Sequence, residues 1–63
     1  MLTPSQHQAV TTLRADDMQL AANAAARQWN RGYKFDPPPL LPIATRQLIK
    51  AANDDLKAPA KLA

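Results

Sequence analysis

The 63-residue sequence predicts an all-α, helical hairpin-like protein: a long N-terminal helix, an extended proline-rich strap and a shorter second helix. Three observations predict this fold. The chain has no glycine or proline between Pro4 and Gly32, four of its six prolines lie within residues 37–42, and an amphipathic pattern resumes over residues 43–57. Proline disfavours helix at its own position and at the preceding residue, so the proline cluster separates two helical segments.

The first helix is predicted over residues 4–31. Thr3 can accept a hydrogen bond from a free backbone N–H, proline suits the next position, and Gln6 completes a capping box. Near the other end, Arg27 and Arg31 favour helix because cations are stabilised at the negative end of the helix dipole. These residues therefore predict one continuous helix.

Two apolar stripes run along this predicted helix at helical spacing. One contains Met18, Ala21, Ala22, Ala25 and Trp29, and the other contains Val10, Leu13, Leu20 and Ala24. The high helix propensity of alanine accounts for part of this composition. Small side chains also let a second helix approach closely, so the same residues favour helix packing.

The remaining residues predict a strap, a second helix and a tail. Residues 33–42 are expected to follow an extended, largely polyproline II path. In the second helix, residues 43–57, the apolar face contains Thr45, Leu48, Ile49, Ala52 and Leu56, and the polar face contains Arg46, Lys50, Asn53 and Lys57. Pro59 ends that helix, so residues 58–63 are predicted to be a frayed tail.

The unequal lengths of the two helices lead to the first functional hypothesis. One short helix cannot cover both apolar stripes of a long one, so apolar area should remain for another copy or a different protein to cover. We expect a non-enzymatic interaction protein or structural accessory subunit that docks on a larger partner or self-associates, as in a virus particle. The predicted partner-binding residues are Val10, Leu13, Met18, Ala21, Ala22, Ala25, Trp29, Tyr33 and Phe35.

The alternative hypothesis is a nucleic-acid-associated or regulatory protein. Cations alternate with aromatic residues in the segment 27–35, a composition that tracks phosphates and stacks bases. The expected contacts are Arg27, Arg31 and Lys34, together with Trp29 and Tyr33. A phage-type inhibitor that binds a host enzyme is a further possibility, and it would use the same surface as the first hypothesis.

The composition argues against catalysis and cofactors. The chain has no cysteine, one histidine and one glycine. It therefore lacks the residues for a zinc site with the usual ligands and for a phosphate-binding glycine loop. Asp16 and Asp17 are adjacent, as are Asp54 and Asp55, and adjacent side chains on a helix diverge instead of converging. We therefore expect no catalytic residue, metal, cofactor or small-molecule substrate.

Charge and hydropathy limit the partners and the compartment. The net charge of +3 is spread along the chain, which favours acidic partners only mildly. The sequence lacks the basic and apolar regions of a secretory signal and the apolar run of a membrane span. We expect no membrane association and a location in the cytoplasm or within a macromolecular assembly.

Overall fold

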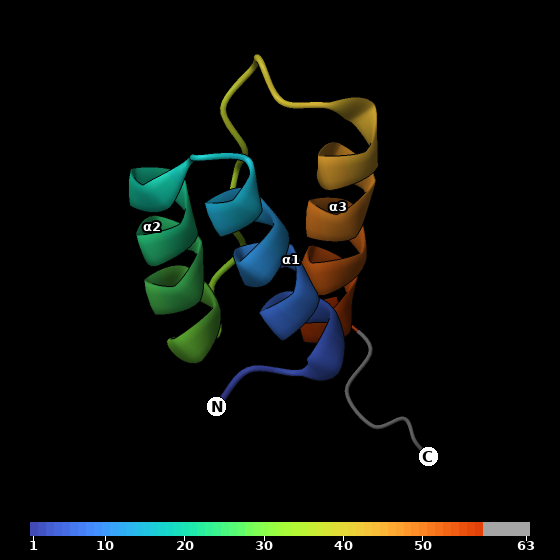
Figure 1. The fold of residues 1–63 in the computed structure, drawn as a ribbon. Coiled ribbons are helices and arrows are strands. Elements are labelled where there is room, and N and C mark those ends of the chain that lie inside the picture. The colour runs from blue at the N-terminus through green and yellow to red at the C-terminus, as the bar shows by residue number, and fades with distance from the viewer. Residues whose placement is uncertain (58–63) are drawn as a thin grey trace.

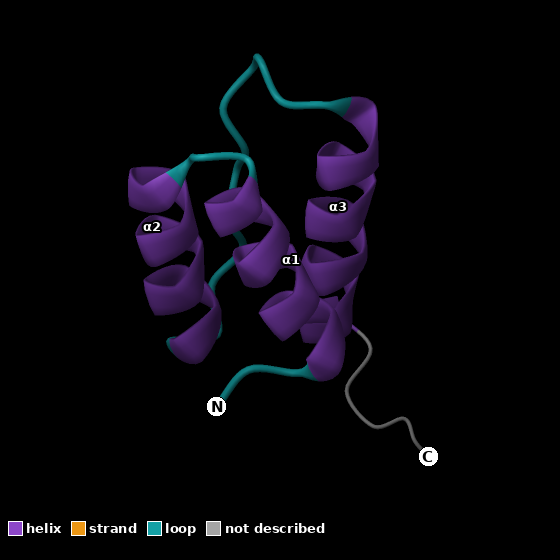
Figure 2. Cartoon of the chain, in the orientation of Figure 1, coloured by secondary structure: helices purple, strands orange, loops and turns teal. Residues whose placement is uncertain are grey.

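The computed structural model describes residues 1–57, which form three helices and no strand (Figure 2). Helix α1 spans Pro4–Ala15, α2 spans Gln19–Asn30 and α3 spans Ile43–Lys57. The all-α prediction and the predicted second helix are confirmed. The predicted tail, residues 58–63, lies outside the described residues.

The predicted start of α1 is confirmed in detail. Thr3 Oγ1 accepts a hydrogen bond from the backbone N–H of Gln6 at 3.2 Å, and the backbone N–H of Thr3 donates to Gln6 Oε1 at 3.0 Å. This reciprocal pair is a capping box, and it provides partners for groups that the first turn of a helix leaves free.

The prediction of one helix over residues 4–31 is wrong, because the chain turns between Ala15 and Gln19. Asp17 adopts a φ of 64°, in the left-handed region. The N–H of Met18 donates to the carbonyl of Leu13 at 2.9 Å, and the N–H of Asp17 donates to that of Arg14 at 3.0 Å. This pair of hydrogen bonds is the Schellman motif that ends many helices.

The end of α2 repeats the same motif. Gly32 has a φ of 82°, Tyr33 N–H donates to the Gln28 carbonyl at 2.8 Å, and Gly32 N–H donates to that of Trp29 at 3.0 Å. Here the left-handed residue is glycine, which adopts positive φ without steric cost. The two motifs differ in their left-handed residue, which is Asp17 after α1 and Gly32 after α2. Only Gly32 indicated a helix end in the sequence.

Asp17 and Gly32 both adopt left-handed conformations, so substitutions at these two positions should change the free energy of unfolding in opposite directions. Asp17→Gly should raise the free energy of unfolding by about 1 kcal/mol, since a non-glycine residue is strained in this region. Gly32→Ala should lower it by about 1 kcal/mol. A Cβ at Gly32 would meet no atom within 4 Å, so that loss would come from the backbone conformation alone. Urea denaturation measures both changes, and a lower stability for Asp17→Gly would contradict the assignment.

Helix α1 lies between the other two helices and contacts both of them (Figure 1). Because the chain reverses at Asp17, α2 folds back along one side of α1, and α3 covers another side. The expectation that a long helix is left partly uncovered by a short one is therefore corrected. The core contains Ala9, Val10, Leu13, Ala22, Ala25, Trp29, Phe35, Leu41, Ile49 and Ala52.

Residues 33–42 connect α2 to α3 without a helix or strand, but they do not follow one continuous extended path. A turn at Pro39 and Leu40 interrupts the segment, and the loop rises to an apex before it enters α3 (Figure 1). Phe35 and Leu41 are buried in the core. The connection is therefore part of the packed structure and holds two of its apolar side chains.

Candidate interaction surface

Most of the side chains predicted to bind a partner are buried within this chain. Six of them belong to the core: Val10, Leu13, Ala22, Ala25, Trp29 and Phe35. Met18 and Ala21 are partly buried and pack against that core, whereas Tyr33 is 59% exposed. The apolar stripes of residues 10–29 are thus largely covered by the chain itself, and a partner would have to bind elsewhere.

Asn53 connects the aromatic segment to α3. Its Oδ1 accepts hydrogen bonds from Trp29 Nε1 at 2.8 Å and from the Phe35 N–H at 2.9 Å, and its Nδ2 donates to the Phe35 carbonyl at 2.9 Å. The Trp29 and Phe35 rings meet edge to face with their centroids 5.9 Å apart. Sequence reasoning placed Asn53 on the polar face of α3, and this is wrong because the side chain is buried.

A second buried polar contact holds the α1–α2 turn against the start of α3. Thr45 is buried, and its Oγ1 donates to Asp16 Oδ2 at 2.7 Å. Periodicity alone assigned Thr45 to the apolar face, and it gave no sign of this partner. The contact fixes the turn and the first turns of α3 at one end of the molecule.

The predicted nucleic-acid contacts are only partly available. Arg27, Arg31 and Lys34 are exposed, and so is Tyr33. The Trp29 and Phe35 rings, by contrast, are packed in the core. Stacking of successive bases needs accessible ring faces, so this segment offers one aromatic platform instead of three.

Helices α2 and α3 begin at the same end of the bundle (Figure 1), and each has an exposed aliphatic side chain in its first turn. Leu20, in the first turn of α2, is 85% exposed, and Leu40, in the loop, is 91% exposed. Ile43, the first residue of α3, is 74% exposed. We refer to Leu40 and Ile43, which are close in sequence, as the apolar patch. Sequence reasoning missed both residues, because neither continues an apolar stripe.

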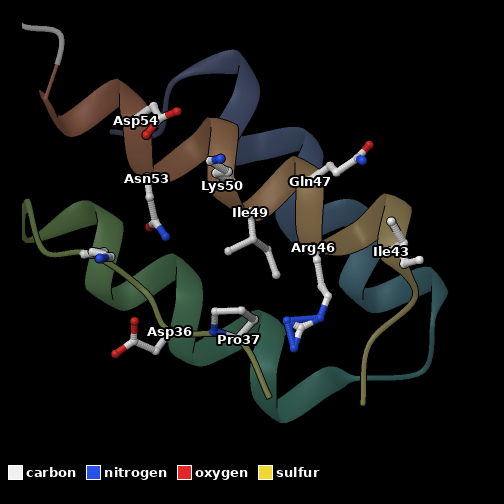
Figure 3. A pocket seen from close by; sticks show the side chains of 10 residues that line it. Asp36, Pro37, Ile43, Arg46, Gln47, Ile49, Lys50, Asn53 and Asp54 are labelled. Carbon is white, nitrogen blue, oxygen red and sulfur yellow. The ribbon is translucent and has the colours of Figure 1, made fainter. Parts of the chain in front are cut away.

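A groove of about 410 Å³ runs between residues 34–37 and α3 and has Ile43 of the apolar patch in its lining (Figure 3). We call it the loop–α3 groove. Its lining contains Lys34, Asp36, Pro37, Ile43, Arg46, Gln47, Ile49, Lys50, Asn53 and Asp54. Arg46 Nη2 donates to the Pro39 carbonyl at 3.3 Å, so this side chain reaches from α3 to the loop just beyond residues 34–37.

Among residues 1–57, no three histidine or acidic side chains come together in a way that could hold a metal ion. None of the helices described there has the length and hydropathy needed to cross a bilayer. His7 is exposed in the first turn of α1. Comparison with family models, with curated proteins and with solved structures finds no match.

Proposed function

We propose that this chain is a non-enzymatic accessory subunit that docks on a larger protein partner through the apolar patch. The observation that carries the proposal is the exposure of Leu40 and Ile43, two large aliphatic side chains three positions apart, of which Ile43 also lines the groove. Contiguous exposed apolar area rimmed by polar residues is typical of protein interaction sites. The groove rim supplies such residues in Arg46, Gln47 and Lys50.

The residues around the patch are anchored in the fold, which supports docking without large rearrangement. Leu41, between the two patch residues, is buried, and Ile43 begins a helix held through the contact of Thr45 with Asp16. Side chains held on a fixed backbone lose less conformational freedom on binding. A patch of this kind suits an accessory component of a larger assembly, and self-association through the same patch is the other form of this proposal.

The nucleic-acid alternative has less support. Its three cations are exposed, but two of its three aromatic rings are covered, and the groove contains carboxylates that would repel phosphates. If this chain inhibits a host enzyme, that inhibition would be one form of docking and would use the same apolar patch.

The test is affinity capture from the cells that produce the chain, with variants of the patch as controls. Full burial of one such aliphatic side chain contributes about 1.5–3 kcal/mol, and about 1.4 kcal/mol is a tenfold change in affinity. Leu40→Asp and Ile43→Asp should therefore each weaken capture of the partner at least about tenfold.

Tyr33→Asp is the matched control, because Tyr33 is an exposed apolar side chain that follows the far end of α2. It should leave capture unchanged. Light scattering on the purified chain distinguishes docking on a different protein from self-association. Capture that is equal for the wild-type chain and both patch variants would refute the proposal.

A further inference from the structure

We propose that the loop–α3 groove binds an acidic peptide segment of the protein partner, with a carboxylate on Arg46 and a neighbouring aliphatic side chain against Ile43 and Pro37. This inference rests on the proposed docking function and names the chemistry of the docked segment. It is carried by the position of Arg46, by the distribution of charge along the groove, and by the apolar surface beside that charge.

Arg46 is positioned before any ligand arrives. Its side chain extends from α3 toward the loop, beside Pro37 (Figure 3), and Nη2 donates to the Pro39 carbonyl at 3.3 Å. A guanidinium has five N–H donors, so one such bond leaves others for a ligand. Since Arg46 is exposed, these donors are accessible to a carboxylate, which arginine binds in a two-point geometry.

The charges are unevenly distributed along the groove. Figure 3 shows Asp36 and Asp54 toward one end, and Arg46 with Ile43 toward the other. Lys50 lies four residues after Arg46, so both cations share one face of α3. Arg46 therefore makes the end near Ile43 positive, and this end attracts a carboxylate. The other end combines the two aspartates with Lys34, two residues before Asp36, so it offers a carboxylate no net positive charge.

The groove surface near Arg46 is apolar. Ile43 is 74% exposed and Pro37 is partly buried, so both can cover an aliphatic side chain. Asn53 also lines the groove, but its amide is already engaged with Trp29 and Phe35. The groove groups that remain to contact a peptide are therefore the cations and the aliphatic surface.

A peptide fits these features better than a nucleic acid does. A phosphate could bind Arg46, but a continuous polyanion would also pass Asp36 and Asp54 in the same groove. A sugar–phosphate backbone has no aliphatic group to cover Ile43. An acidic residue next to Leu, Ile, Val or Met satisfies both the charge and the apolar surface.

Selection from a random peptide display library on the immobilised full chain tests this inference. We expect the enriched peptides to combine Asp or Glu with an adjacent large aliphatic residue. Synthetic copies of them should bind the wild-type chain, and in ¹⁵N-labelled protein they should shift the amide resonances of residues 34–36 and 43–54. Arg46→Gln should weaken their binding at least about tenfold, as expected for a lost charged hydrogen bond.

Two variants control this experiment. Arg27→Gln removes an exposed cation from α2, outside the groove, and should leave the affinity unchanged. Arg46→Lys should restore only part of the affinity, because lysine keeps the charge but lacks the fork of donors. Circular dichroism checks that each variant is folded.

Three results would overturn the inference: no enriched peptide, enriched peptides without acidic residues, or affinity unaffected by Arg46→Gln. The docking proposal itself fails on a different result, namely partner capture that is insensitive to both Leu40→Asp and Ile43→Asp. The two failures are therefore distinguishable.

Discussion

Asn53→Ala is expected to lower the free energy of unfolding by at least about 3 kcal/mol, since it leaves three buried polar groups without partners at about 1–3 kcal/mol each. These groups are the Trp29 indole N–H and the backbone N–H and carbonyl of Phe35. Domains of this length have a total stability of about 3–9 kcal/mol. The variant should therefore lose a large share of its stability, and it should unfold at room temperature if the total lies near the lower end of that range.

Asn23→Ala is the control for this experiment, because Asn23 is an exposed asparagine on α2. Its stability should change by less than about 0.5 kcal/mol. Urea denaturation followed by circular dichroism and by Trp29 fluorescence measures both variants. Equal stability losses at the two positions would show that Asn53 does not hold the aromatic segment.

Leu13→Ala is expected to lower the free energy of unfolding by about 2–5 kcal/mol, the range for truncating a fully buried leucine. Leu13 is 0% exposed and lies on α1, the helix that contacts both others. Leu20→Ala is the same change at a side chain that is 85% exposed, and it should cost less than about 0.5 kcal/mol.

The same comparison separates two roles for Leu13. If its side chain mainly contacted a partner, as its sequence pattern suggested, the isolated chain would lose little stability when it is truncated. If it belongs to the core, the isolated chain should unfold at a clearly lower urea concentration. Denaturation of the purified chain without any partner decides between them.

The sequence predicted helix ends best where specific residues mark them. Thr3 and Gln6 form the expected capping box, and the prolines after Phe35 separate the helices as expected. The break at Asp17 was missed because aspartate is compatible with either a helix interior or a left-handed turn. The difference lies in hydrogen bonds to Leu13 and Arg14, which sequence spacing does not encode.

The candidate site was less predictable than the fold. Apolar periodicity identifies residues that are buried, but it does not tell whether they are buried in the same chain or against a partner. Trp29 illustrates this, since it was predicted to bind a partner but is buried in this chain. Its hydrogen-bond partner, Asn53, lies 24 residues away on a face that the sequence pattern marks as polar. Leu40 and Ile43 stand out only once the chain is folded and their exposure can be seen.

The central place of α1 also affects how the chain folds during synthesis. Helix α1 leaves the ribosome first, and α2 can pack on it soon afterwards because the two are joined by a short turn. The α1 surface that receives α3 has no intramolecular partner until α3, the last of the three helices, emerges. Nascent chains are most prone to aggregation while apolar surface is uncovered, so this protein should be most prone to aggregation in the interval before α3 covers α1.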